Sequence, residues 1–99
     1  MKMVFVIYNE FFNPQVMGLL HSAGIDYYTR WSDLHGKGRG TDAHLGRGGH
    51  PSTNAALMIA FEDLAPLETL VRRITAWNAE SKRPDDRIRL FQVPLERMI

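Results

Sequence analysis

The sequence predicts an α+β domain in which four strands and two helices follow one another in the order βαββαβ. A chain of 99 residues has room for one small domain, here residues 1–99. Four short runs are rich in apolar and aromatic residues, as strands are, and two stretches between them carry apolar residues at helical spacing. This order predicts the split βαβ, or ferredoxin-like, arrangement, a four-stranded antiparallel sheet with both helices on one face.

The expected strands lie at residues 3–8, 25–32, 55–61 and 87–93. A sheet covered by helices on one face only should alternate between apolar and polar residues. The first and third strands are instead apolar at almost every position, so we expect the second face to be covered as well. Another copy of the chain is the simplest cover. The alternative is an apolar surface exposed to solvent, which proteins tolerate.

The two helices are predicted from their ends and their apolar stripes. Asn13 is expected to cap the first helix with its side chain, Pro14 suits the first helical position, and Gly24 is expected to end the helix. Asp63 is expected to cap the second helix. The buried stripe of that helix is predicted to be Leu67, Leu70, Val71 and Ile74.

Composition narrows the classes of partner. The net charge is +1 and there is no cysteine. A near-neutral chain is not expected to bind nucleic acid through bulk charge. The lack of cysteine excludes disulfides and thiolate sites and suits a reducing compartment, so we expect a cytoplasmic protein. No apolar run approaches the length of roughly 18 residues that a membrane helix needs, so membrane insertion is not expected.

A long loop is predicted over residues 34–53, and it concentrates unusual residues. Six of the eight glycines and three of the four histidines lie within residues 35–50. At its start stands the segment Gly36-Lys37-Gly38-Arg39-Gly40, in which alternating glycines allow backbone N–H groups to surround an anion. The spacing matches neither the Walker motif nor the dinucleotide fingerprint. The alternative for this segment is a flexible surface loop.

The three loop histidines, His35, His44 and His50, form a candidate metal site. Imidazole is a good ligand for Zn, Cu or Ni. Their spacing matches no established ligand pattern, and histidines exposed to solvent are the alternative.

Arginine predominates among the basic residues, with nine Arg against three Lys. Arg83, Arg87 and Arg89 cluster around the last turn and strand. Arginine binds phosphate or carboxylate through two parallel hydrogen bonds, so this cluster could bind an anionic ligand. The alternative is an edge strand protected by its charges.

No catalytic motif is present. The chain has neither a cysteine nucleophile nor the G-x-S-x-G or H-E-x-x-H patterns. We therefore expect a protein that is not an enzyme.

Taken together, the βαββαβ order, the chain length and the segment Gly36-Lys37-Gly38-Arg39 resemble the P-II signalling proteins and their P-II-like relatives. Members of that family have a Gly-x-Gly-Arg segment at the base of a long T-loop. They also have a Gly-Asp-Gly-Lys turn before an apolar strand, where this chain has Pro84-Asp85-Asp86-Arg87. This chain looks like a divergent member, because that turn has lost both glycines and Gly40 replaces the glutamine of the T-loop pattern.

The resemblance implies a homotrimeric sensor that binds a small effector in clefts between subunits. In the family this effector is an adenine nucleotide such as ATP, ADP or AMP. The loop base would form one wall of the cleft, and Arg87 and Arg89 would reach the phosphates. The loop would then signal to a target protein or transporter. The implied ligand-binding residues are Gly36, Lys37, Gly38, Arg39, Gly40, Arg87 and Arg89.

Two alternatives stay open. The first is a metal-responsive P-II-like protein that uses His35, His44 and His50. The second belongs to another class: a small dimeric α/β-barrel monooxygenase or isomerase with His21, His35 or Trp31 in an internal cleft. The oligomeric state distinguishes the two classes, since the P-II-like proteins are trimers.

Overall fold

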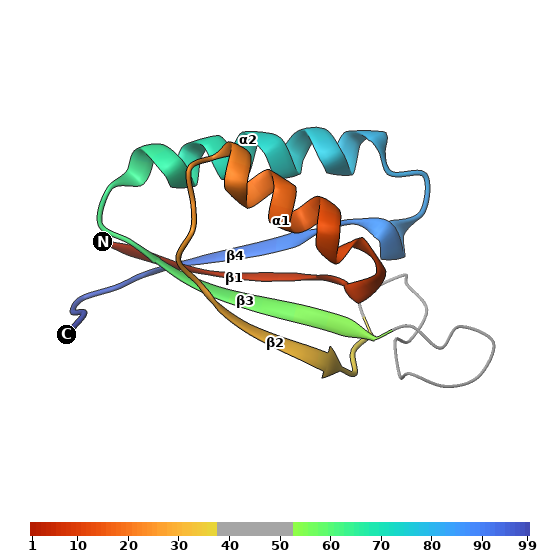
Figure 1. The fold of residues 1–99 in the computed structure, drawn as a ribbon, viewed down its shortest axis with the longest axis horizontal. Helices are drawn as coiled ribbons and strands as arrows, with labels where there is room; N and C mark the ends of the chain where they lie inside the picture. Colours follow the sequence, from red (N-terminus) through yellow and green to blue (C-terminus); the bar gives the residue numbers. More distant parts are fainter. Residues whose placement is uncertain (38–52) are drawn as a thin grey trace.

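The structure, a computed structural model, describes residues 1–37 and 53–99 (Figure 1). It is a four-stranded antiparallel sheet in the order β2-β3-β1-β4, with both helices on one face. The predicted ferredoxin-like fold is therefore confirmed. The elements are β1 (Lys2–Asn9), η1 (Glu10–Phe12), α1 (Asn13–Ser22), β2 (Thr29–Leu34), β3 (Asn54–Phe61), α2 (Leu64–Glu80), η2 (Pro84–Asp86) and β4 (Arg89–Pro94).

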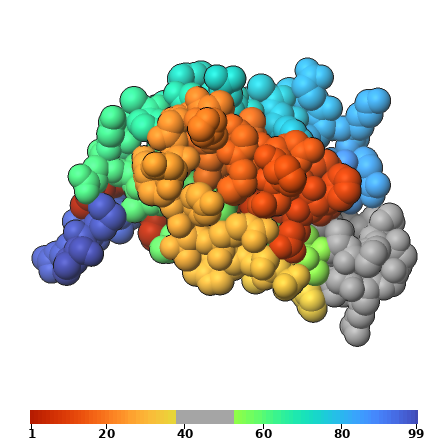
Figure 2. Space-filling view, in the orientation of Figure 1, coloured from red at the N-terminus to blue at the C-terminus, as the bar shows by residue number. Residues whose placement is uncertain are grey.

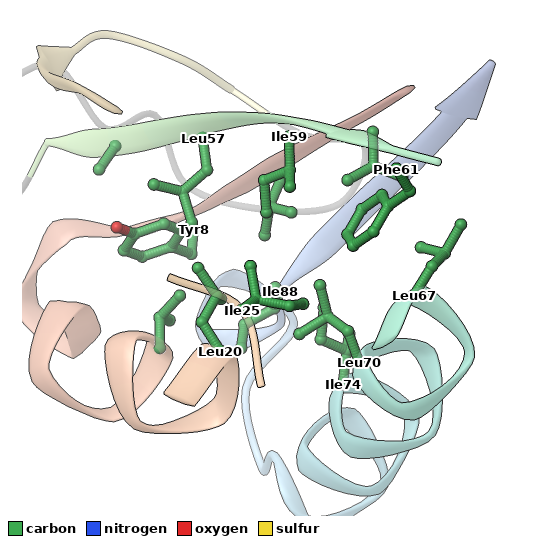
Figure 3. Close-up of a cluster of buried hydrophobic side chains, with 14 residues drawn as sticks. Tyr8, Leu20, Ile25, Leu57, Ile59, Phe61, Leu67, Leu70, Ile74 and Ile88 are labelled. Carbon is green, nitrogen blue, oxygen red and sulfur yellow. The ribbon is translucent and has the colours of Figure 1, made fainter. Parts of the chain in front are cut away.

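The hydrophobic core lies between the sheet and the two helices (Figure 3). Alternate residues of β1 and β3 point toward the helices. Helix α2 buries Leu67, Leu70 and Ile74 of its predicted stripe, and Val71 is half-buried. Two buried isoleucines from the segments that follow the helices, Ile25 and Ile88, belong to the same core. The largest buried side chains include Tyr8, Leu57, Ile59 and Phe61 from the sheet and Leu20, Leu67, Leu70 and Ile88 from the other side.

The second strand is shorter than predicted. It begins at Thr29, whereas the sequence predicts a start at residue 25. Ile25 instead completes the end of α1: its N–H donates to the Leu20 carbonyl at 2.9 Å, and the Gly24 N–H donates to the His21 carbonyl at 3.0 Å. This is the Schellman pattern, and Gly24 adopts the left-handed conformation that it needs, with φ of 76°. Gly24 therefore ends the helix as predicted, and the buried Ile25 belongs to that ending.

The starts of the helices agree with prediction at one helix and disagree at the other. Asp63 caps α2, because its Oδ1 accepts a hydrogen bond from the Ala65 N–H at 3.1 Å. The prediction for Asn13 is wrong. Asn13 is the first residue of α1, and its Oδ1 accepts from the Tyr8 hydroxyl and from Arg30 Nε instead of a backbone N–H. The side-chain oxygen that local sequence rules assign to a backbone N–H of the helix start is instead hydrogen-bonded to side chains of β1 and β2.

The last strand begins at Arg89, later than the predicted residue 87. Residues 84–86 form a 3-10 turn, in which the Arg87 N–H donates to the Pro84 carbonyl at 3.3 Å. The turn uses the backbone groups that a strand would need for pairing.

The two faces of the sheet differ in burial. On β1, Val4, Val6 and Tyr8 are buried under the helices, whereas the alternate residues Met3, Phe5 and Ile7 are half-buried. On this second face Phe5 pairs with both Met58 and Phe91. Phe91 is 54% exposed, and no described helix lies over this face (Figure 1). The apolar second face that the strands predict is therefore present, and among the described residues of a single chain it is open.

Candidate functional site

The described part of the predicted nucleotide site lies at one end of the sheet. The 34–53 segment leaves the sheet here, since β2 ends at Leu34 and β3 begins at Asn54, which pairs with the last residue of β1. At the same end β4 begins at Arg89, which pairs with Ile7. The C-terminal residues extend from the opposite end of the molecule (Figure 2). The topology thus brings the stems of the predicted loop and the start of β4 to the same end of the sheet.

The first wall of the predicted site is seen only at its base. Gly36 is half-buried beside Asn54, and a Cβ at this position would lie 2.9 Å from the Asn54 side-chain nitrogen. A side chain at residue 36 would therefore displace the Asn54 amide. Lys37 is exposed next to it. The remaining residues predicted for this wall, Gly38, Arg39 and Gly40, lie outside the described residues.

The second wall is held by the end of α2. Asn78 binds the backbone of Ile88 twice, since Asn78 Oδ1 accepts from the Ile88 N–H and Asn78 Nδ2 donates to the Ile88 carbonyl, both at 2.8 Å. Trp77 Nε1 donates to the Asp86 carbonyl at 3.1 Å. Ile88 is buried, and the side chains of Arg87 and Arg89 on either side of it are exposed. These arginines are therefore presented to solvent from a fixed backbone.

Arg83, the third arginine of the cluster, pairs within its own turn. Its Nη2 lies 3.1 Å from Asp85 Oδ2.

The two walls lie on opposite edges of the sheet. β2 and β4 are separated by β3 and β1, and three strand spacings correspond to about 14 Å. The described residues of the two walls, Gly36 and Lys37 on one side and Arg87 and Arg89 on the other, therefore lie at opposite edges of the same sheet.

A polar cluster that the sequence did not predict lies between the stems. Its centre is Glu10, the first residue of η1. Glu10 Oε1 accepts from Arg30 Nη2 at 3.1 Å, and Glu10 Oε2 accepts from the Thr53 hydroxyl at 2.7 Å and from the Asp33 N–H at 3.2 Å. The Thr53 hydroxyl, with smaller contributions from Asp33 and Arg30, lowers the pKa of Glu10 below its usual value although partial burial opposes this.

Arg30 connects this cluster to the hydrophobic core through hydrogen bonds. Its Nε donates to Asn13 Oδ1 at 3.0 Å and lies 3.4 Å from the hydroxyl oxygen of the buried Tyr8. Burial raises the pKa of Tyr8. The signal in the sequence was Arg30 itself, a charged residue in a strand, but the strand register is needed to see that it pairs with Leu57 and so faces the helices.

The predicted metal site is described at one residue only. His35 is exposed, and His44 and His50 lie outside the described residues. In residues 1–37 and 53–99 no three His, Asp or Glu side chains come together as a metal site would require. The three-histidine site stays a prediction.

The residues proposed for an enzyme cleft are not brought together. His21 is exposed on α1, which belongs to the helical layer. Trp31 pairs with Ala56 on the open face of the sheet and is 45% exposed. His35 lies at the loop stem. The sheet itself separates His21 from Trp31. A cleft that contains one of the three stays a prediction.

A cavity of about 600 Å³ opens at the far end of the open sheet face. Its walls include Tyr27, Tyr28, Met58 and Met98, together with Glu62 and Asp63. None of the residues predicted for ligand or metal binding lines it. No helix in the described part of the chain is both long and apolar enough to cross a membrane.

Fold and topology define the chain as a ferredoxin-like domain with a long insertion between its second and third strands. Among solved structures it is similar to CPII, a nitrogen regulatory PII-like protein from Thiomonas intermedia K12, bound to ADP, AMP and bicarbonate. The identity is 18%, the TM-score is 0.69, and the match covers 97% of this chain and 88% of CPII. CPII bound to ADP and bicarbonate matches over the same shares, with 17% identity and a TM-score of 0.67.

A protein from Thermus thermophilus described as PII-like in signalling is also similar. It has 14% identity and a TM-score of 0.58, over 93% of this chain and 83% of that one. No protein-family model matches the sequence, and a search of curated proteins found no match. At these identities the likeness shows a shared fold, and the predicted resemblance to P-II-like proteins is confirmed at that level.

Proposed function

We propose that this chain is a divergent P-II-like regulatory protein of the cytoplasm, and not an enzyme. It forms a homotrimer that binds an adenine nucleotide between subunits and signals to a partner protein through the 34–53 segment. The observation that carries this proposal is the likeness in fold to CPII over 97% of the chain, because the CPII structures hold ADP, AMP and bicarbonate.

The open sheet face supports association with further copies. Phe91 and Val93 of β4 and the half-buried Phe5 of β1 form part of one apolar surface. Continuous apolar surface of this kind marks interaction sites on soluble proteins. A closed ring of identical chains buries such a face on every copy.

The separation of the two walls supports a ligand site between subunits. Gly36 and Lys37 lie at the β2 edge, and Arg87 and Arg89 lie at the β4 edge of the same chain. A neighbouring copy can bring its β4 edge to the β2 edge of the first. Backbone N–H groups and the lysine from one chain then meet the arginines of the next around the phosphates.

The turn before β4 changes how this site would bind phosphate, compared with the turn of the P-II-like proteins. Where P-II-like proteins have glycines, this chain has Pro84 and Asp86, and these lie with Asp85 in a 3-10 turn. Two carboxylates repel a phosphate that approaches the turn backbone, so phosphate recognition falls to the guanidinium groups of Arg87 and Arg89.

A thermal-shift panel with ATP, ADP and AMP tests the ligand. A ligand at a hundred times its dissociation constant adds about 2.7 kcal/mol to the native state, which corresponds to a rise on the order of 10 °C for a domain of this size. We expect the shift to be lost in the double variant Arg87→Ala, Arg89→Ala. Arg73→Ala, an exposed arginine on α2, is the matched control and should keep it. If no nucleotide shifts the wild-type protein, the nucleotide-sensor proposal is wrong.

Light scattering tests the assembly. We expect the mass of three chains, and a dimer would favour the α/β-barrel alternative.

Zn²⁺ and Ni²⁺ in the same thermal panel test the histidine prediction. A metal shift that survives the triple variant His35→Ala, His44→Ala, His50→Ala excludes these residues as the ligands.

A further inference from the structure

The carboxylate of Glu10 occupies a cradle of donors that come from both stems of the 34–53 segment. On the β2 side the donors are Arg30 Nη2 and the Asp33 N–H, and on the β3 side the donor is the Thr53 hydroxyl. The Glu10 N–H also donates to the Thr53 carbonyl at 2.9 Å. One residue of η1 is thus hydrogen-bonded to both stems, which are far apart in the sequence.

The conformation of Asp33 supports a holding role for Glu10. Asp33 has φ of 57°, which a residue other than glycine rarely adopts. It lies in the irregular stretch between Trp31 and Leu34, where the pairing of β2 with β3 shifts register. The N–H of this strained residue is the one that Glu10 accepts. Strain of this kind persists where surrounding contacts hold it, and it is common at functional sites.

The cradle is anchored to the core on its other side. Arg30 reaches Glu10 with Nη2 and reaches Asn13 with Nε, so its guanidinium joins the cluster to the first turn of α1. The Tyr8 hydroxyl donates to the same Asn13 oxygen at 2.5 Å, and Tyr8 is buried under the helices. One chain of hydrogen bonds therefore connects the stems to the hydrophobic core, through Arg30, Asn13 and Tyr8.

We propose that Glu10 is the positioning residue for both stems, with its carboxylate serving as the internal anion of an anion-binding cradle. The stems carry Gly36 and Lys37, so the position that Glu10 imposes sets the geometry of that wall of the ligand site. This last consequence rests on the proposed function. The positioning role itself does not.

The first experiment measures hydrogen exchange at the Asp33 amide in the full chain by NMR. In Glu10→Ala we expect protection to fall by about twofold to fivefold, the factor for losing a hydrogen bond to a partly exposed carboxylate that solvent screens. Acetate, which supplies a carboxylate of the size removed, should restore protection in this variant and leave the wild type unchanged. Acetamide and sodium chloride are the controls, and neither should restore it.

Unchanged exchange at Asp33 in Glu10→Ala, or equal rescue by sodium chloride, would overturn the proposal. If Glu10→Ala does not fold, the Thr53 pair replaces it. Thr53→Ser keeps the hydroxyl and should keep protection of the β3 stem, whereas Thr53→Val should lower it. Equal exchange in the two Thr53 variants contradicts the positioning role.

A ligand measurement separates the positioning role from the proposed function. If ADP binds the wild type, we expect its affinity to fall in Glu10→Ala and to recover with acetate. If ADP does not bind the wild type but the exchange results hold, the positioning role stands and the nucleotide function fails. If ADP binds and the exchange at Asp33 is indifferent to Glu10, the positioning role fails and the function stands.

Discussion

The two faces of the sheet are built from similar residues and have different surroundings. Ile59 and Met58 are neighbours on β3, yet Ile59 is 1% exposed beneath the helices while Met58 is half-buried on the open face. Both side chains are apolar, so composition does not distinguish them. The comparison shows that apolar residues at successive positions of a strand supply both sheet faces, whereas the helices in the described part of the chain cover one of them.

The largest effect is expected at the open face. Phe91→Glu places a charge on the exposed apolar row and should convert the proposed trimer into single chains, because burying an unpaired carboxylate in an apolar interface is strongly unfavourable. The far-ultraviolet circular dichroism of the variant should match that of the wild type. Light scattering measures the mass. Arg73→Glu on the exposed side of α2 is the control. If the Phe91→Glu variant stays trimeric, this face is not the interface.

The next largest effect compares the two faces on one strand. Ile59→Ala should lower the free energy of unfolding by about 2–5 kcal/mol, the usual result of truncating a buried aliphatic side chain. Met58→Ala should cost less than half as much in the separated chains of the Phe91→Glu background. Urea denaturation measures both. Equal losses at the two positions would mean that the open face is already covered within one chain.

A smaller effect is expected where the helical layer turns back toward the sheet. Gly24→Ala should cost about 1–2 kcal/mol, because an L-residue resists the left-handed conformation that the end of α1 requires. A Cβ at this position would meet no atom within 4 Å, so the loss comes from the backbone alone. Thermal unfolding checks it, with Gly18→Ala inside the same helix expected to be neutral or stabilising. A neutral Gly24→Ala would contradict the role of its backbone conformation.

The smallest effect is expected at the polar rim beside the loop stems. The pKa of Glu10 is lowered in the folded chain, so its stabilising contribution is complete above the unfolded value of about 4.5 and is lost as pH falls through the folded value. The contribution is at most about 1 kcal/mol, because solvent screens a partly exposed pair. Urea denaturation at a series of pH values should show this decline in the wild type. The Glu10→Gln variant should lack the part of this decline that comes from Glu10. If the two proteins show identical pH profiles, Glu10 does not cause the decline.

Most of the fold was predictable because its signals are local. The apolar runs located β1 and β3 within a residue or two, and Gly24 and Asp63 marked helix ends by backbone conformation and side-chain capping. The start of β2 was not predictable in this way. Tyr27 and Tyr28 have strand-like composition, but Ile25 is drawn into the end of α1 and delays the strand.

The candidate site was predictable only in part. Residue type suggested Gly36, Lys37, Arg87 and Arg89, and the fold places them at one end of the sheet, but their role in ligand binding stays a prediction. The Glu10 cluster could not be identified, because its members are contributed by β1, η1, α1, β2 and Thr53. Asn13 shows the difficulty directly: local rules assign its oxygen to a helix start, and the donors that occupy it come from residues 8 and 30.

The sequence by itself determined the element order, the apolar character of both sheet faces and the residue types available for binding an anion. These properties depend on spacing and chemistry along the chain. Only the tertiary structure decided which apolar face the helices cover and which donors surround Glu10. Both depend on strand register, which brings residues distant in the sequence into contact and which a shift of one position would reverse.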